Sequence, residues 1–195
     1  MKFIRPILLF IVIMHVSGCT TTRMSKYSIH KNKFICNEVT TDLGNIIVLP
    51  EAAWRSDQKE PIKREEMAIG EIKSVFKNFP CGKISLPGAI RHFSNWSDVP
   101  ESEMLNKFSN EGIDTVIIIR MEELTPRLEI TFSIPFLWSG SSEVDFRIRV
   151  ISIKTGHTLN DMRIKRITGG PFNVRPAEWS RAEFNAALHS IIKKE

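Results

Sequence analysis

Thr115-Val116-Ile117-Ile118-Ile119 is the stretch that decides the fold of this 195-residue chain. Every residue in it is β-branched, a composition that favours a strand. The run is also too short to form a buried helix of ordinary length. We therefore predict a central strand of a β-sheet at this position.

Two longer runs follow in which apolar and polar residues alternate. The apolar positions of the first run are Leu128, Ile130, Phe132, Ile134 and Phe136, and those of the second are Val144, Phe146, Ile148 and Val150. A period of two is typical of a strand with one buried and one solvated face. Ser139-Gly140-Ser141-Ser142 lies between the runs, which predicts a hairpin with its turn at these residues.

The rest of the chain alternates between expected strands and helices. Short strands are expected at residues 44–50 and 83–87, and a turn at residues 154–157 leads into a strand from residue 159. Helices are expected from Pro61 to Phe79, from Ser97 or Asp98 to near Gly112, and from Pro176 onward. The order β-α-β-α-β-β-β-β-α predicts an α/β fold, a single mixed-sheet sandwich with helices packed on the sheet.

The amino terminus has the three parts of a secretory signal. Basic residues precede an apolar run of about ten residues, too short to cross a bilayer, and the run ends in Val16-Ser17-Gly18-Cys19. This arrangement resembles the lipobox of bacterial lipoproteins, in which the cysteine is acylated and the chain is cut just before it. The resemblance implies a signal peptide at 1–18 and an anchor to a membrane through acyl chains on Cys19.

Downstream of Cys19 we expect a lipidated tether at 19–33 and one envelope domain at 34–195. Thr20 is not the aspartate that retains enterobacterial lipoproteins in the inner membrane. We therefore expect the periplasmic face of the outer membrane as the location. The net charge of +5 falls by two when Lys2 and Arg5 are lost with the signal, and this mild basicity does not indicate nucleic-acid binding. It is compatible with peptidoglycan or anionic headgroups nearby.

Cys36 and Cys81 remain once Cys19 is assigned to the lipid. In an oxidising compartment two cysteines are able to form a disulfide that persists. The alternative is a pair of free buried thiols, which is common for cysteine. The spacing in the sequence does not choose between the two states.

Three stretches resemble a group of envelope α/β domains: residues 46–50, 112–118 and 150–159. The group comprises the amino-terminal domain of the Tol-system propeller protein, the lipoproteins that activate peptidoglycan synthases, and the curli-secretion lipoprotein. Glu51 and Ser152 depart from the pattern of these families, which have an aromatic residue and an aspartate there. The resemblance implies a domain that binds other envelope proteins.

No pattern of catalytic or metal-binding residues is present. The histidines outside the signal are His30, His92, His157 and His189, which are far apart and lack the spacing of metal ligands. Gly169-Gly170-Pro171 predicts a turn and no phosphate loop, because proline lacks the amide that a phosphate would bind. We expect no enzymatic activity and no cofactor.

Two modes of action therefore stay open. Phe136-Leu137-Trp138 lies at the expected end of the hairpin, where aromatic residues are typical contacts with a protein partner. An alternative is that Trp138 closes the core of the domain. The second mode takes residues 127–151 as a transmembrane hairpin of an oligomeric outer-membrane pore or secretion channel. In that case Glu129, Asp145, Arg147 and Arg149 would face the lumen.

Overall fold

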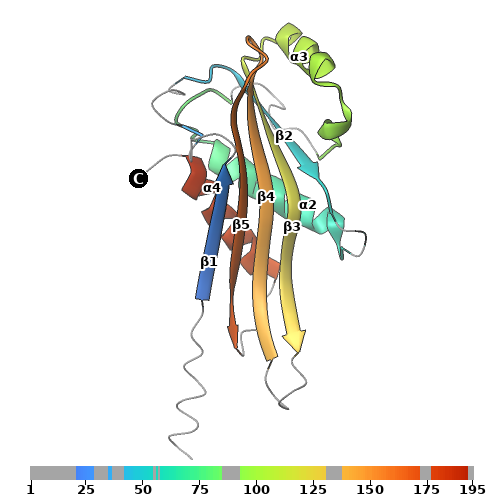
Figure 1. The fold of residues 1–195 in the computed structure, drawn as a ribbon, viewed down its shortest axis with the longest axis vertical. Helices are drawn as coiled ribbons and strands as arrows, with labels where there is room; N and C mark the ends of the chain where they lie inside the picture. Colours follow the sequence, from blue (N-terminus) through green and yellow to red (C-terminus); the bar gives the residue numbers. More distant parts are fainter. Residues whose placement is uncertain are drawn as a thin grey trace, which may run out of the picture.

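The computed structural model describes residues 21–28, 35–36, 42–54, 56, 58–84, 93–130, 138–171 and 177–192. They form one five-stranded sheet with the strand order β1-β5-β4-β3-β2 (Figure 1). The strands are β1 (Thr21–Ser28), β2 (Ile46–Ala52), β3 (Thr115–Ile130), β4 (Trp138–Ser152) and β5 (Thr158–Pro171). Only β2 and β3 are parallel, so the sheet is mixed. The predicted α/β class is confirmed.

Strand β3 begins at Thr115, as predicted, but it continues for 16 residues. The two separate strands expected at 115–119 and from residue 128 are therefore one strand. A register shift between Met121 and Glu123 lets it bend without ending. The charged residues between the two predicted strands pair with β4 and form no loop.

The hairpin turn predicted at Ser139–Ser142 was wrong. These residues lie inside β4, where Gly140 pairs with Leu128 of β3 and with Gly170 of β5. The turn predicted at Gly169-Gly170-Pro171 was also wrong, because these three residues lie in β5 and pair with β4. The connection between β3 and β4 falls at 131–137, outside the described residues.

Helices α2 (Pro61–Phe76) and α4 (Ala177–Ile192) cover one face of the sheet. The main core lies between this helical layer and the side chains of β2 to β5; Phe146 of β4, for example, meets Phe184 of α4 edge to face at 5.1 Å. Glu71 of α2 is buried and accepts hydrogen bonds from Arg181 and Asn185 of α4. A carboxylate shared with these two side chains joins the two helices.

In the part of the chain that the structure describes, the opposite face of the sheet is covered only near one end. There the short η1 (Trp96–Asp98) and α3 (Glu101–Asn110) pack on Ile47, Leu49 and Ile118 of β2 and β3. Gly112, with a φ of +72°, ends α3, as expected from the sequence. Among the described residues, no helix covers the rest of this face.

Part of the expected tether at 19–33 belongs to the sheet. Thr21–Ser28 forms the edge strand β1, which pairs antiparallel with β5 from Thr21 opposite Gly169 to Ser28 opposite Met162. An edge strand of this kind is largely solvated, so its sequence is polar and resembles a linker. Lys26 Nζ also donates to the carbonyl of Ser190 in α4, 2.7 Å away.

The strand expected at 83–87 is reduced to one bridge within the described residues. Lys83 pairs with Asn45, at the beginning of β2, and residues 85–87 lie outside the described part of the chain.

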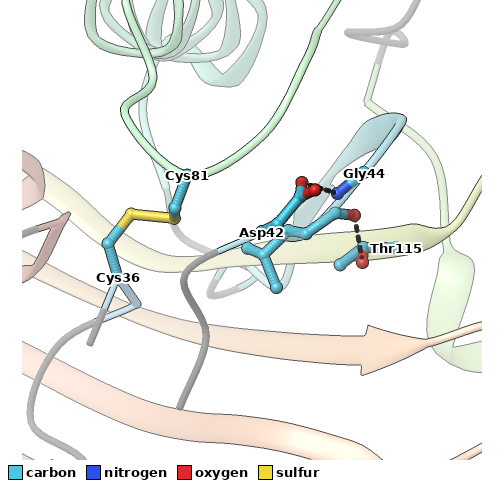
Figure 2. The surroundings of a disulfide bond; sticks show 6 residues. Cys36, Asp42, Gly44, Cys81 and Thr115 are labelled. Atoms are coloured by element: carbon cyan, nitrogen blue, oxygen red, sulfur yellow. Dashed lines mark hydrogen bonds between the residues drawn. A yellow bond between two sulfur atoms is a disulfide. The ribbon is translucent and has the colours of Figure 1, made fainter. Parts of the chain in front are cut away.

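A disulfide joins Cys36 to Cys81 (Figure 2). The Cys36 amide donates to the carbonyl of Ile192 at the end of α4, and the Leu43 amide donates to the carbonyl of Cys81. Thr115 Oγ1 donates to the Leu43 carbonyl at 2.7 Å. The bridge therefore connects the end of α4, the segment after α2 and the beginnings of β2 and β3.

Removal of this bridge is expected to lower the Tm. The two cysteines are 45 residues apart, and closing a loop of that length in the unfolded chain is worth about 4 kcal/mol. For a domain of this size the loss corresponds to about 10 °C. The Cys36→Ala/Cys81→Ala double variant should show it in thermal unfolding followed by circular dichroism. Dithiothreitol should lower the Tm of the wild type to that of the double variant, and it should leave the Tm of the double variant unchanged. A wild-type Tm that is the same with and without the reductant would contradict the prediction.

Candidate interaction face

The uncovered face of the sheet carries a row of arginines in cross-strand register. Arg163 of β5 is opposite Arg147 of β4, which is opposite Arg120 of β3. We call these three residues the arginine row. Tyr27 of β1 and Glu51 of β2 continue it at the two edges of the sheet. Alternation along each strand puts all five side chains on the same face.

Each arginine of the row is bound to an acid on the same face. Arg147 donates from Nε and Nη2 to the two carboxylate oxygens of Asp161, at 2.6 and 2.5 Å. Arg163 makes the same two-pronged contact with Asp145, at 3.0 Å for both bonds, and Arg120 pairs with Glu51 at 3.2 Å. Arg163 also binds Glu122. Such bidentate arginine–carboxylate pairs are strong and fix the orientation of both groups.

These hydrogen bonds raise the pKa of two guanidinium groups. The bond to Asp161 raises the pKa of Arg147, and the bond to Asp145 raises that of Arg163; burial opposes both effects. Both arginines are therefore charged at every physiological pH.

The acids lie deep and the arginines lie at the surface. The carboxylate side chains of Glu51, Asp161 and Asp145 are only 6%, 9% and 6% exposed. The side chains of Arg120, Arg147 and Arg163 are 40%, 41% and 51% exposed. A partner that approaches this face therefore meets guanidinium groups first.

Two hollows flank Arg147. One, with a volume of about 350 Å³, lies between the sheet and the beginning of α3; its charged lining includes Arg120, Arg147 and Arg149. The other, about 230 Å³, lies toward β1, where Tyr27 is 71% exposed. The face is therefore contoured on both sides of its central arginine.

The arginine row lies well away from the expected anchor. Tyr27 is six residues after Thr21, which corresponds to roughly 20 Å along a strand. Cys19 is two residues before Thr21, a distance of at most about 7 Å. The row therefore lies some way along the sheet from the end at which Thr21 begins β1.

The other predicted site residues have separate positions. Cys19, Phe136 and Leu137 lie outside the described residues, and so does the side chain of Trp138. The backbone of Trp138 begins β4, opposite Ile130, three residues beyond the row in which Ser141 pairs with Gly169. Because Gly169 also pairs with Thr21, Trp138 lies at the end of the sheet where the lipid anchor is expected.

The alternation in β4 did place Asp145, Arg147 and Arg149 together, on the face that the pore interpretation assigned to a lumen. It did not reveal the partners of Arg147 and Asp145, because Asp161 and Arg163 come from β5 and meet them only through the register. Tyr27 was missed because its segment was assigned to the tether.

The described residues contain neither a cluster of metal ligands nor a membrane-spanning helix. Within them, no three histidine, cysteine or acidic side chains come together as metal ligands. No helix found there is both long and apolar enough to cross a membrane.

No protein-family model and no curated protein matches this chain. Solved structures are similar to it in fold. A PelC variant dodecamer from Paraburkholderia phytofirmans aligns over 90% of this chain and 100% of that chain, with 9% identity and a TM-score of 0.45. The lipoprotein GNA1162 from Neisseria meningitidis aligns over 76% and 97%, with 12% identity and a TM-score of 0.43.

A putative neuraminyllactose-binding hemagglutinin homolog from Helicobacter pylori aligns over 85% of this chain and 84% of its own, with 12% identity and a TM-score of 0.39. With TM-scores below 0.5 and identities of 12% or less, none of these similarities assigns a function to this chain.

A double-mutant cycle tests the coupling of Arg147 to Asp161. Arg147→Met leaves a buried carboxylate without its guanidinium and should lower the free energy of unfolding by about 1–2 kcal/mol, a value reduced from that of a fully buried pair because the arginine is half-exposed. Arg147→Met/Asp161→Leu removes both charges and should be more stable than the single variant. Urea unfolding measures these two variants and Asp161→Leu, the single variant that completes the cycle, with Arg23→Met on the exposed part of β1 as the matched control. Additive losses in the double variant would show that the two residues are not coupled.

Proposed function

We propose that this chain is a non-catalytic accessory lipoprotein of the bacterial cell envelope, which binds another envelope protein through the open face of its sheet. The observation that carries the proposal is the arginine row, half-exposed above buried acids on a face that no described helix covers. Arginine and tyrosine are enriched at the centres of protein interfaces. Tyr27, at the end of the same row, is the most exposed aromatic side chain among the described residues.

Two features, one on each side of β1 in the sequence, support the proposed cellular location. The lipobox precedes this strand, and Cys36, a few residues after it, is bound to Cys81. Disulfides persist in extracytoplasmic compartments, where acylated lipoproteins reside. We place the protein on the periplasmic face of the outer membrane, held by acyl chains on Cys19.

The structure favours the accessory role over a pore. Phe146, Ile148 and Val150 of the proposed transmembrane hairpin are buried against the helical layer and form its main core. Inserting these strands in a bilayer would expose the apolar face of α4 to water. Phe136-Leu137-Trp138 stays a predicted second contact.

Acylation of Cys19 predicts a specific labelling result. Cells that express the full chain and are fed an alkyne analogue of palmitate should label the wild type, and Cys19→Ala should abolish the label because no other residue carries the lipobox. Cys81→Ser, which removes a different cysteine, is the control and should stay labelled. In-gel fluorescence after click chemistry measures the result; a labelled Cys19→Ala chain would refute the anchor.

Photo-crosslinking in the native envelope tests the interaction face. A photoreactive amino acid replaces Tyr27 in one strain and Lys73, exposed on α2, in another. We expect a discrete protein adduct from position 27 and none from position 73, because only the first lies on the arginine face. Mass spectrometry identifies the adduct. Adducts from position 73 alone would move the interface to the helical layer, and muropeptide adducts at position 27 would make peptidoglycan the partner.

A further inference from the structure

The larger hollow is a site of mixed character. One wall carries the guanidinium groups of Arg120, Arg147 and Arg149, and the other carries the apolar side chains of Trp96, Val99 and Met104. Trp96 is held there by Phe108, 6.0 Å away, and by Lys107 over its ring. The volume of about 350 Å³ is at the lower end for ligand sites, enough for one or two amino-acid residues.

Two of its arginines retain hydrogen-bond donors. Arg147 uses Nε and Nη2 for Asp161, which leaves Nη1 for a second acceptor. Arg149 has Glu101 as its ion-pair partner, at 4.0 Å, beyond hydrogen-bonding distance. Both side chains are partly exposed, at 41% and 37%.

The beginning of α3 borders the same hollow. Pro100 and Glu101 line it, and no side chain caps this end of the helix. The first amide groups of a helix favour an anion placed before them, but Glu101 and Glu103 in the first turn already offset part of this effect. Of the carboxylates in the lining, Glu51 is buried and paired with Arg120, and Glu101, 50% exposed, is 4.0 Å from Arg149. The remaining donors of Arg147 and Arg149 therefore supply the attraction for an anion.

We propose that this hollow binds an acidic peptide segment of the partner, with a carboxylate between Arg147 and Arg149 and an adjacent apolar side chain against Trp96 and Met104. The inference rests on the proposed function and adds the chemistry of the partner. A carboxylate beside an apolar group matches both walls, whereas inorganic phosphate would use only the arginine wall.

Fluorine NMR of the full chain in detergent, labelled with 5-fluorotryptophan, tests the proposal. Trp96→Phe identifies the resonance of Trp96 among those of the four tryptophans. The probe is acetyl-Asp-Leu-amide and its neutral control is acetyl-Asn-Leu-amide. A ligand of this size should bind with a Kd on the order of 0.1–1 mM, and the neutral peptide should bind about tenfold more weakly.

Arg149→Gln should weaken the binding of the acidic peptide about tenfold, while Arg23→Gln, which removes an exposed arginine on β1, should leave it unchanged. The proposal would be overturned if the Trp96 resonance shifts with neither peptide, or if it shifts equally with both. Equal responses to phosphate and to the acidic peptide would overturn it in favour of a general anion site. If the site fails while Tyr27 adducts persist, the accessory role stands; if the adducts are also absent, both proposals fail.

Discussion

The pairing of β1 with β5 is the constraint on which the arrangement of this molecule depends. Eight residues that begin two positions after Cys19 are bound in register to β5, so an acyl anchor there connects to the sheet almost directly. A long flexible tether would let the domain search the periplasm in any orientation. A short one would limit how far each strand row can lie from the membrane. The arginine row lies roughly 20 Å along the strands from the end of the sheet at Thr21, and the hollow beside α3 lies farther from that end.

The second constraint is the one-sided cover of the sheet. The helical layer buries one face. The other face presents buried carboxylates close to half-exposed guanidinium groups. Asp145, Asp161 and Glu51 are nearly inaccessible to water, and a buried carboxylate without a partner is costly. The register meets this demand by placing an arginine within reach of each one. Stability and recognition thus draw on the same side chains, because the guanidinium groups that neutralise the acids are also the groups that a partner would meet.

The sequence predicted the structure correctly where the conformational preference of a few neighbouring residues decides it. The β-branched run at Thr115 gave a strand, Pro61 began a helix, and the turns at Gly112 and Gly156 require the positive φ that glycine adopts easily. The prediction failed where pairing with a strand that is distant in the sequence decides the conformation. Thr21–Ser28 is a strand because β5 offers it an edge, and Ser139–Ser142 stays extended because both neighbours bind it. The candidate site falls in the second class: alternation grouped the charges of β4, but the partners of Arg147 and Asp145 depend on a register that no local pattern encodes.

The geometry of β1 also has a mechanical consequence. Any load between a membrane-held amino terminus and a partner bound higher on the domain pulls along the axis of this strand. Its hydrogen bonds to β5 run perpendicular to that axis, so they are strained together in shear and do not open one after another. The hydrogen bond from Lys26 to the carbonyl of Ser190 in α4 also links β1 to the helical layer. An acyl anchor at Cys19 would therefore attach the domain through a strand that resists tension along its axis.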